Sequence, residues 1–144
     1  MGTDASVCST MPTEVNMKRV TGLGGVFFRC DDKTAQLDWY RTHLGIESEA
    51  WGTMFRWQDE KTQDTGYTVW APFAKDSKYF EGPSMINYRV EDLGALLEEL
   101  KKEGVEIIDG PKDEENGRFA WIRDPEGNRI ELWEPVPGKD DPYL

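Results

Sequence analysis

The chain has 144 residues, a formal net charge of −11 and 38% hydrophobic residues, among them six tryptophans. This length suits one domain or two half-domains that share a core. The acidic charge argues against nucleic acid and anionic membranes as partners, because no basic stripe is present to bind phosphates. The same charge fits a cytoplasmic protein, and no apolar run is long enough to span a bilayer.

The N-terminal segment 1–19 reads as a flexible leader, since the residues up to about Lys18 lack the apolar core of a signal peptide. It contains Cys8, whereas Cys30 lies in an apolar strand pattern. A disulfide between them would tie a leader to a core, so we predict two free thiols in a reducing compartment.

Two stretches about sixty positions apart follow the same pattern. Residues 26–32 and 86–92 each read as a strand ending in two acids, which favour the start of a helix as N-caps and at the positive end of its dipole. The helices that follow end before Gly45 and Gly104, where a left-handed C-cap is expected. The second helix carries an apolar stripe of leucines that predicts a core-facing side.

Shorter strands come after each predicted helix. Segment 54–57 corresponds to 118–121, and 67–72 corresponds to 130–135, with the last pair both ending in Trp-x-Pro. Each half therefore reads β-α-β-β-β, which indicates an internal duplication.

The repeat sets the predicted domain organisation. The boundaries are a leader at 1–19, one domain at 20–135 made of modules 20–72 and 84–135, and a tail at 136–144.

The last predicted strand carries the most informative side chains. It follows the tight turn Asp-Pro-Glu-Gly and alternates, with Ile130 and Leu132 on one face and Arg129, Glu131 and Trp133 on the other. A carboxylate between a guanidinium and an indole is expensive to shield from water unless something binds there.

In these elements the chain resembles the vicinal oxygen chelate superfamily: glyoxalase I, bleomycin-resistance proteins, extradiol dioxygenases and methylmalonyl-CoA epimerase. The resemblance implies an α+β fold in which two tandem β-α-β-β-β modules form a curved, cup-like mixed sheet, with helices outside, the ligand inside and a homodimer as the common assembly. It covers about residues 20–135 and is carried by Trp39-Tyr40-Arg41-Thr42-His43-Leu44-Gly45 and Asp124-Pro125-Glu126-Gly127-Asn128-Arg129-Ile130-Glu131-Leu132.

Catalytic members of that superfamily hold a divalent metal with up to four ligands, from the first and last strand of each module. The resemblance places these positions at Gly25, Thr68, Met85 and Glu131. Only the Glu131 carboxylate is a good donor for a hard metal. We therefore predict no bound metal and no cofactor. The lone histidine, His43, is interpreted as a helix-end capping or dipole partner rather than a ligand.

Alternation along the strands predicts which side chains face the cup and bind a small-molecule ligand. For the arginines, contact with an anionic ligand and a salt bridge to Glu131 both stay open; for the tryptophans, ligand stacking and sheet packing both stay open, and Trp57 and Trp121 are further candidates. The predicted ligand-binding residues are Phe27, Arg29, Thr68, Trp70, Asn87, Arg89, Arg129 and Trp133.

These observations leave three functional hypotheses. The first is a metal-free, homodimeric binding protein of the glyoxalase/bleomycin-resistance type that holds an aromatic or anionic molecule. The second is a lyase or isomerase of the glyoxalase superfamily, with Glu131 as the catalytic base or as a metal ligand. The third is a cup filled by its own side chains in a protein that acts through its surface.

Overall fold

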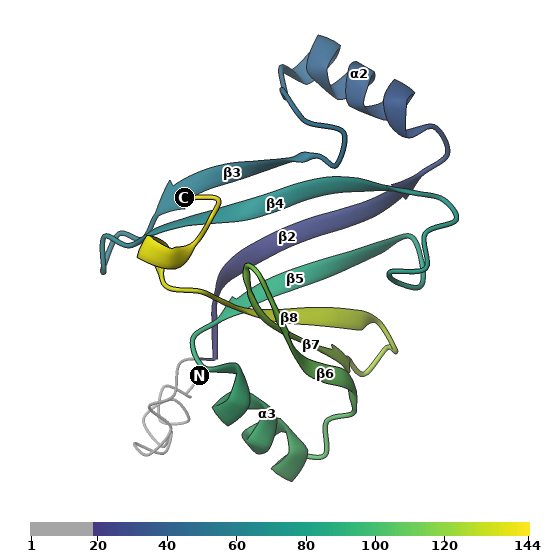
Figure 1. Cartoon of the computed structure of the whole chain (residues 1–144). Helices are drawn as coiled ribbons and strands as arrows, with labels where there is room; N and C mark the ends of the chain where they lie inside the picture. The colour runs from purple at the N-terminus through teal and green to yellow at the C-terminus, as the bar shows by residue number, and fades with distance from the viewer. Residues whose placement is uncertain (1–18) are drawn as a thin grey trace, which may run out of the picture.

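The computed structural model describes residues 19–144. Apart from Arg19, the predicted leader with Cys8 lies outside the described residues. Seven strands form one open mixed sheet in the order β3-β4-β2-β5-β8-β7-β6, with two α-helices (Figure 1). The predicted α+β fold with a curved sheet is confirmed. The elements are β2 (Val20–Cys30), α2 (Lys33–Leu44), β3 (Thr53–Gln58), β4 (Thr65–Ala74), β5 (Ser84–Val90), α3 (Leu93–Lys102), β6 (Ile107–Glu114), β7 (Gly117–Arg123), β8 (Arg129–Pro135) and a short 3₁₀ helix, Gly138–Asp140.

The sheet consists of two halves that repeat one pairing scheme. Module one contains β2, α2, β3 and β4, and module two contains β5, α3, β6, β7 and β8. In each module the first strand pairs in parallel with the last: Phe27 lies opposite Ala71, and Asn87 lies opposite Glu131. Antiparallel pairing of β2 with β5 joins the modules. Where module two has β6, module one has only an isolated bridge between residues 49 and 52.

Both helices begin and end as their sequences predict. Asp32 and Asp92 are the N-caps, and each side chain accepts a hydrogen bond of 3.0 Å from the backbone N–H three residues on. Gly45 and Gly104 follow the helices with φ of 70° and 80°, the left-handed conformation that glycine adopts at little cost.

The outer face of the sheet is the one that the helices cover, and it is covered unevenly. Helix α3 buries four leucines against β6, β7 and β8. Helix α2 lies at the opposite end of the sheet in Figure 1 and has no buried residue. Its Tyr40 contacts the rings of Phe28 and Trp70, which extend from the outer face of β2 and β4.

The opposite face, here called the cup face, carries a second cluster made mostly of aromatic side chains. Register assigns residues to it: Phe27 pairs with Ala71 and Met85, and Glu131 pairs with Asn87 and Trp121. Its buried members are Phe27, Tyr67, Ala71, Phe80, Met85, Phe119, Trp121 and Trp133.

The segment after β8 folds back over this face. The Tyr67 hydroxyl donates to the buried Asp141 carboxylate at 3.2 Å, and Arg56 donates to the Tyr143 carbonyl at 2.9 Å. The residues predicted as a tail therefore pack against β3 and β4.

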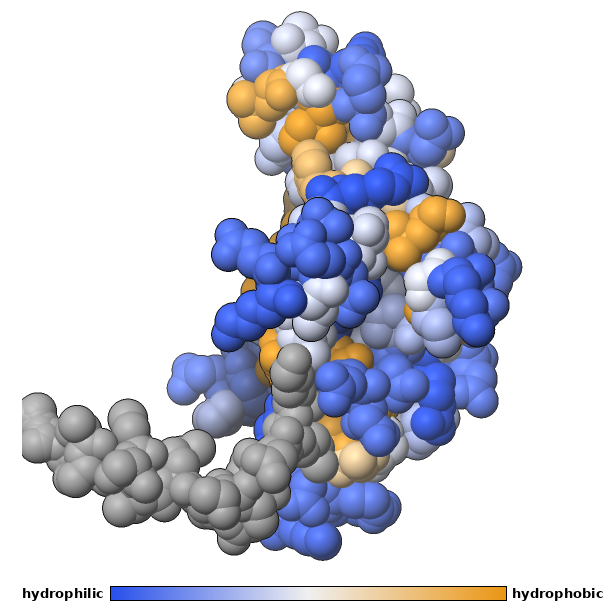
Figure 2. Space-filling model, turned by 90° about the vertical axis from the view of Figure 1, so that its left-hand side faces the viewer, coloured by the Kyte–Doolittle hydropathy of each residue, from blue (hydrophilic) through white to orange (hydrophobic). Residues whose placement is uncertain are grey.

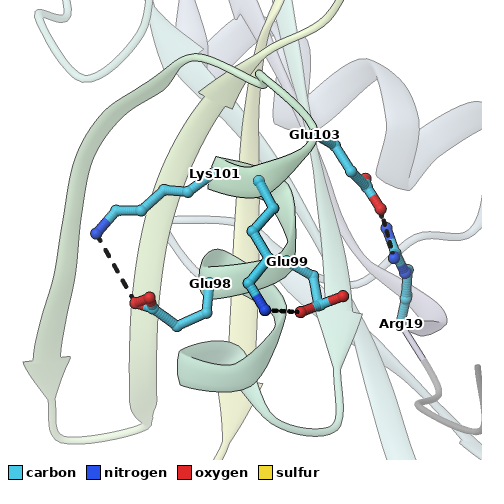
Figure 3. A network of polar contacts seen from close by, with 6 residues as sticks. Arg19, Glu98, Glu99, Lys101 and Glu103 are labelled. Atoms are coloured by element: carbon cyan, nitrogen blue, oxygen red, sulfur yellow. Dashed lines mark hydrogen bonds and ion pairs between the residues drawn. The ribbon is translucent and has the colours of Figure 1, made fainter.

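Elsewhere the surface is strongly polar. From the side where the β3–β4 turn and the C-terminal segment lie, hydrophilic residues prevail and hydrophobic ones form separate patches (Figure 2). On α3, Glu98 pairs with Lys101 and Glu99 with Lys102, while Arg19 at the start of β2 makes a two-pronged ion pair with Glu103 (Figure 3). No helix within residues 19–144 is long and apolar enough to cross a membrane.

Candidate functional site

Glu131 lies on β8, on the cup face of the sheet, and is only 1% exposed. Asn87 Nδ2 on β5 donates to its Oε1 at 2.6 Å, and Trp121 Nε1 on β7 donates to its Oε2 at 2.9 Å. The Tyr79 hydroxyl donates a third hydrogen bond to Oε2. Asn87 and Trp121 are the register partners of Glu131, so sheet pairing itself brings two of its three donors to the carboxylate.

The electrostatic environment of Glu131 comes chiefly from burial. Desolvation raises the pKa of this carboxyl above its usual value of 4.5, while the three hydrogen bonds and the charge of Arg129 act in the opposite direction. Burial and the nearby Glu131 charge also raise the pKa of the Tyr79 phenol. The first layer around the carboxylate thus consists of neutral donors, and an acidic group is held in an apolar setting.

Tyr79 comes from the segment that joins the two modules, residues 75–83, here called the connector. Arg29 on β2 holds this connector, since its guanidinium donates to the Gly82 carbonyl at 2.8 Å and the Ser77 carbonyl at 2.9 Å. The same group also donates to the carbonyls of residues 74, 75 and 80. Five backbone acceptors gathered on one cation fix the loop that carries Tyr79 over the cup.

A cavity of about 190 Å³ lies directly against Glu131. Phe73 and Tyr79 stack with centroids 5.6 Å apart on one side, and Phe119 and Trp133 stack 5.9 Å apart on another. Phe27 completes the aromatic part of the lining, and Asn87 and Glu131 supply polar atoms. The result is an apolar enclosure with a few polar groups, a typical composition for a small-molecule site.

A second cavity of about 240 Å³ adjoins the first and shares Val69 and Asn116 with it. Trp51, Met54, Tyr67 and Tyr143 supply the rest of its lining. The two cavities therefore lie side by side, one against Glu131 and the other against Tyr143 of the C-terminal segment.

The sequence comparisons establish the family. The profile of the Glyoxalase/Bleomycin resistance protein/Dioxygenase superfamily matches residues 17–132. The chain belongs to this superfamily. A comparison with curated protein sequences found no significant match.

Solved structures share the superfamily fold at low sequence identity. A Streptomyces coelicolor methylmalonyl-CoA epimerase variant in complex with 2-nitronate-propionyl-CoA is 21% identical (TM-score 0.59), covering 82% of this chain and 99% of that one. The Mycobacterium tuberculosis methylmalonyl-CoA epimerase is 22% identical (TM-score 0.56; 88% and 93% covered). A chain described as a Legionella pneumophila NAD-dependent benzaldehyde dehydrogenase is 17% identical (TM-score 0.54; 78% and 98% covered). These similarities show the fold alone.

Of the predicted ligand-binding residues, three line the cavity beside Glu131: Phe27, Asn87 and Trp133. Arg129 and Arg89 also extend from cup-face positions but contact rings rather than the cavity. The Arg129 guanidinium lies 5.4 Å from the centroid of Trp121, and that of Arg89 lies 4.9 Å from the centroid of Trp133. Whether these residues bind a ligand stays a prediction.

The cup-facing prediction is wrong for Thr68 and Trp70. Trp70 pairs with the outer-face residue Val26, and its ring lies 4.9 Å from Tyr40 of α2. The Thr68 hydroxyl donates to the Leu23 carbonyl at 2.7 Å and accepts from Trp57 Nε1 at 2.9 Å, which places Trp57 on the outer face as well. The residues of β4 that line the cup are instead Val69 and Phe73, with Tyr67 in the adjoining cavity.

Among the described residues, neither Arg29 nor Arg89 forms the salt bridge to Glu131 that the sequence left open. Arg29 is engaged with the connector carbonyls, and Arg89 donates to the Tyr67 carbonyl at 3.2 Å. Burial lowers the pKa of Arg89. Both arginines therefore have structural partners, and neither side chain lines the Glu131 cavity.

Sequence reasoning missed the residues that close the site. Tyr79 lies in a stretch interpreted as a polar connector, although two adjacent aromatics, Tyr79 and Phe80, are a signal that such a segment packs inward. Phe119 lies two residues before Trp121 on β7, so alternation along the strand places both side chains on the same face.

The metal site typical of catalytic superfamily members does not fit these residues. Register places Ala71, rather than Thr68, at the module-one position that matches Glu131. Met85 is buried among the cup aromatics, and Gly25 has no side chain. Within residues 19–144, no three His, Cys, Asp or Glu side chains gather as a metal-binding group. One carboxylate already bound by three protein donors does not form a divalent-metal centre.

Proposed function

We propose that this glyoxalase-superfamily chain binds a small aromatic molecule in its cup and requires no divalent metal to do so. The observation that carries the proposal is the aromatic cavity built against Glu131, whose carboxylate has hydrogen-bond partners from the protein where catalytic relatives have a metal ligand. Stacked rings on two sides favour a flat ligand through dispersion and offset stacking.

The support for an anionic ligand is weaker than for an aromatic one. Arg29 holds the connector, and Arg89 is covered by the faces of Tyr67 and Trp133. A guanidinium already bonded to carbonyls or stacked on rings gives little to an incoming carboxylate without breaking those contacts.

Three finer expectations belong to the same proposal: a bleomycin-resistance-type role in sequestering or carrying a compound, a homodimer, and a cytoplasmic location. The homodimer has support from the outer face between the two helices, where Leu23, Phe55 and Ile86 are exposed apolar side chains.

Titration with benzamide, a neutral flat aromatic amide, tests the proposal. Chemical shifts of the Trp121 and Trp133 indole N–H groups report binding in the cup. We expect saturable one-to-one binding with the same Kd in EDTA and in added Zn²⁺. Val69 lines both cavities, so the larger side chain of Val69→Phe should fill them and abolish the shifts. Ile86→Phe adds similar bulk on the outer face and should leave the shifts unchanged. Binding that requires metal, or that survives Val69→Phe unchanged, contradicts the proposal.

One observation favours the alternative of a lyase or isomerase with Glu131 as base. Oε1 accepts a hydrogen bond from Asn87 alone, so it retains a lone pair for a proton, and burial raises the pKa of the carboxyl. A ligand incubated in D₂O with such an enzyme would exchange a carbon-bound proton, and Glu131→Gln would stop the exchange. A ligand that binds but gains no deuterium supports the binding role.

A further inference from the structure

We propose that the polar end of the ligand is cationic, so that the cup selects a flat aromatic compound bearing an amidinium or ammonium group. This inference rests on the proposed binding function and names the chemical class of its ligand. It is carried by three features of the Glu131 cavity: an acceptor without a donor, a carboxylate without a cation in the lining, and aromatic walls.

The unused acceptor is Asn87 Oδ1. The Asn87 side chain is 2% exposed, its Nδ2 donates to Glu131, and its Oδ1 is buried without a hydrogen-bond partner. A buried carbonyl left without a donor destabilises the protein, and a donor on a ligand would remove that cost.

Gly24 makes room for this acceptor. A Cβ at position 24 would come within 2.0 Å of Asn87 Oδ1 and 2.9 Å of a Trp133 ring carbon. Gly24 and Asn87 both line the cavity. The unpartnered carbonyl therefore packs against Gly24 at the edge of the cavity, where only a residue without a side chain leaves room for it.

The charge in the cavity has one sign. All three hydrogen bonds at Glu131 are donated to its oxygens, which is the arrangement of a carboxylate rather than of a carboxylic acid. No Lys, Arg or His is among the described residues of the lining. Cations pack on rings around the cavity: Arg89 lies 4.9 Å from the centroid of Trp133, and Arg129 and Lys112 lie 5.4 Å and 5.6 Å from the centroid of Trp121.

The aromatic walls of the cavity also favour a positively charged ligand. Phe27, Phe73, Tyr79, Phe119 and Trp133 enclose the cavity, and ring faces attract cations through their quadrupoles. A carboxylate ligand would meet instead the lone pairs of Glu131 Oε1 and Asn87 Oδ1. A planar cation with two N–H groups suits both of these acceptors at once.

Three flat probes of nearly equal size separate charge from shape: benzamidinium, benzamide and benzoate. With the native protein at neutral pH, we expect benzamidinium to bind at least about tenfold more tightly than benzamide, a gain of about 1.4 kcal/mol, and benzoate to cause no shift of the Trp121 and Trp133 indole resonances. Equal or weaker binding of benzamidinium overturns the inference but leaves the proposed function standing. If no probe shifts these resonances, both fall.

Two variants locate the selectivity. In Glu131→Gln, Tyr79 and Trp121 keep an acceptor, but the new amide N–H faces Asn87, so we expect the Asn87 amide to turn over and present N–H to the cavity. The benzamidinium preference should then fall at least about tenfold, with benzamide changed less than about threefold. Gly24→Ala should remove benzamidinium binding, while the outer-face control Ile86→Phe should not. A folded Glu131→Gln protein that retains the full preference contradicts the inference.

Discussion

Module one and module two share a strand pairing but differ in the residues at matched positions. Phe27 opposite Ala71 in module one corresponds, sixty positions on, to Asn87 opposite Glu131 in module two. One module thus supplies an apolar wall and the other a hydrogen-bonded polar pair. The backbone scaffold constrains where side chains point but not their chemistry, so a duplicated fold can concentrate its polar site in one half.

The two helices also differ, in how much apolar surface each packs against the sheet. Helix α3 covers its part of the outer face with buried leucines, whereas α2 covers its part with half-exposed aromatic contacts at one end. Since most helical stability in proteins comes from packing an apolar face, the two helices should contribute very unequally to folding.

The same leucine-to-alanine substitution in each helix tests this difference and has the largest expected effect. Leu96 on α3 is 3% exposed, and Leu44 on α2 is 61% exposed. We expect Leu96→Ala to lower the free energy of unfolding by about 2–5 kcal/mol and Leu44→Ala by less than about 0.5 kcal/mol, measured by urea denaturation. Similar losses from both would mean that α2 is buried in the assembly that exists in solution.

Substitutions of the two arginines at matched positions of the modules should have an effect of intermediate size. Arg29 and Arg89 occupy matched positions, but only Arg29 holds the connector. We expect Arg29→Met to cost about 2 kcal/mol and to expose Lys75 and Lys78 to trypsin, because five carbonyls lose their donor. Arg89→Met should leave the connector resistant, since its contacts are with Tyr67 and the rings beside it. Equal proteolysis of the two variants would refute the assignment of Arg29 as the group that positions the connector.

The polar pair of module two predicts a smaller, pH-dependent effect. Because burial raises the pKa of Glu131, the folded protein binds its proton more tightly than the unfolded chain does. The free energy of unfolding should therefore fall as the pH rises from about 4.5 through the raised pKa.

Glu131→Gln lacks this titration and serves as the control for it. The difference in free energy of unfolding between the two proteins, followed by urea denaturation from pH 4.5 to 8, should change with pH in the stated direction. A constant difference would show that the carboxyl ionises alike in the folded and unfolded states.

Local patterns in the sequence determined much of this protein. The acid pairs and glycines mark the helix ends, since an N-cap or a left-handed C-cap depends on a few neighbouring residues. Period-two alternation placed Glu131, Arg129 and Trp133 on one face, and the internal repeat together with the family resemblance predicted the fold class.

Only the tertiary structure decided the face of β4 and the role of the connector. Both Trp-x-Pro motifs look alike, but strand register matches Ala71 with Glu131, 60 positions on (131 − 71), whereas Pro72 and Pro135 lie 63 positions apart (135 − 72). Matching the prolines therefore shifts the alignment by three residues and reverses the face of Trp70. Strand register is fixed by pairing with distant residues, and a one-residue slip moves every side chain to the other face. Tyr79 likewise reaches Glu131 only because Arg29, fifty positions earlier in the chain, gathers the connector carbonyls.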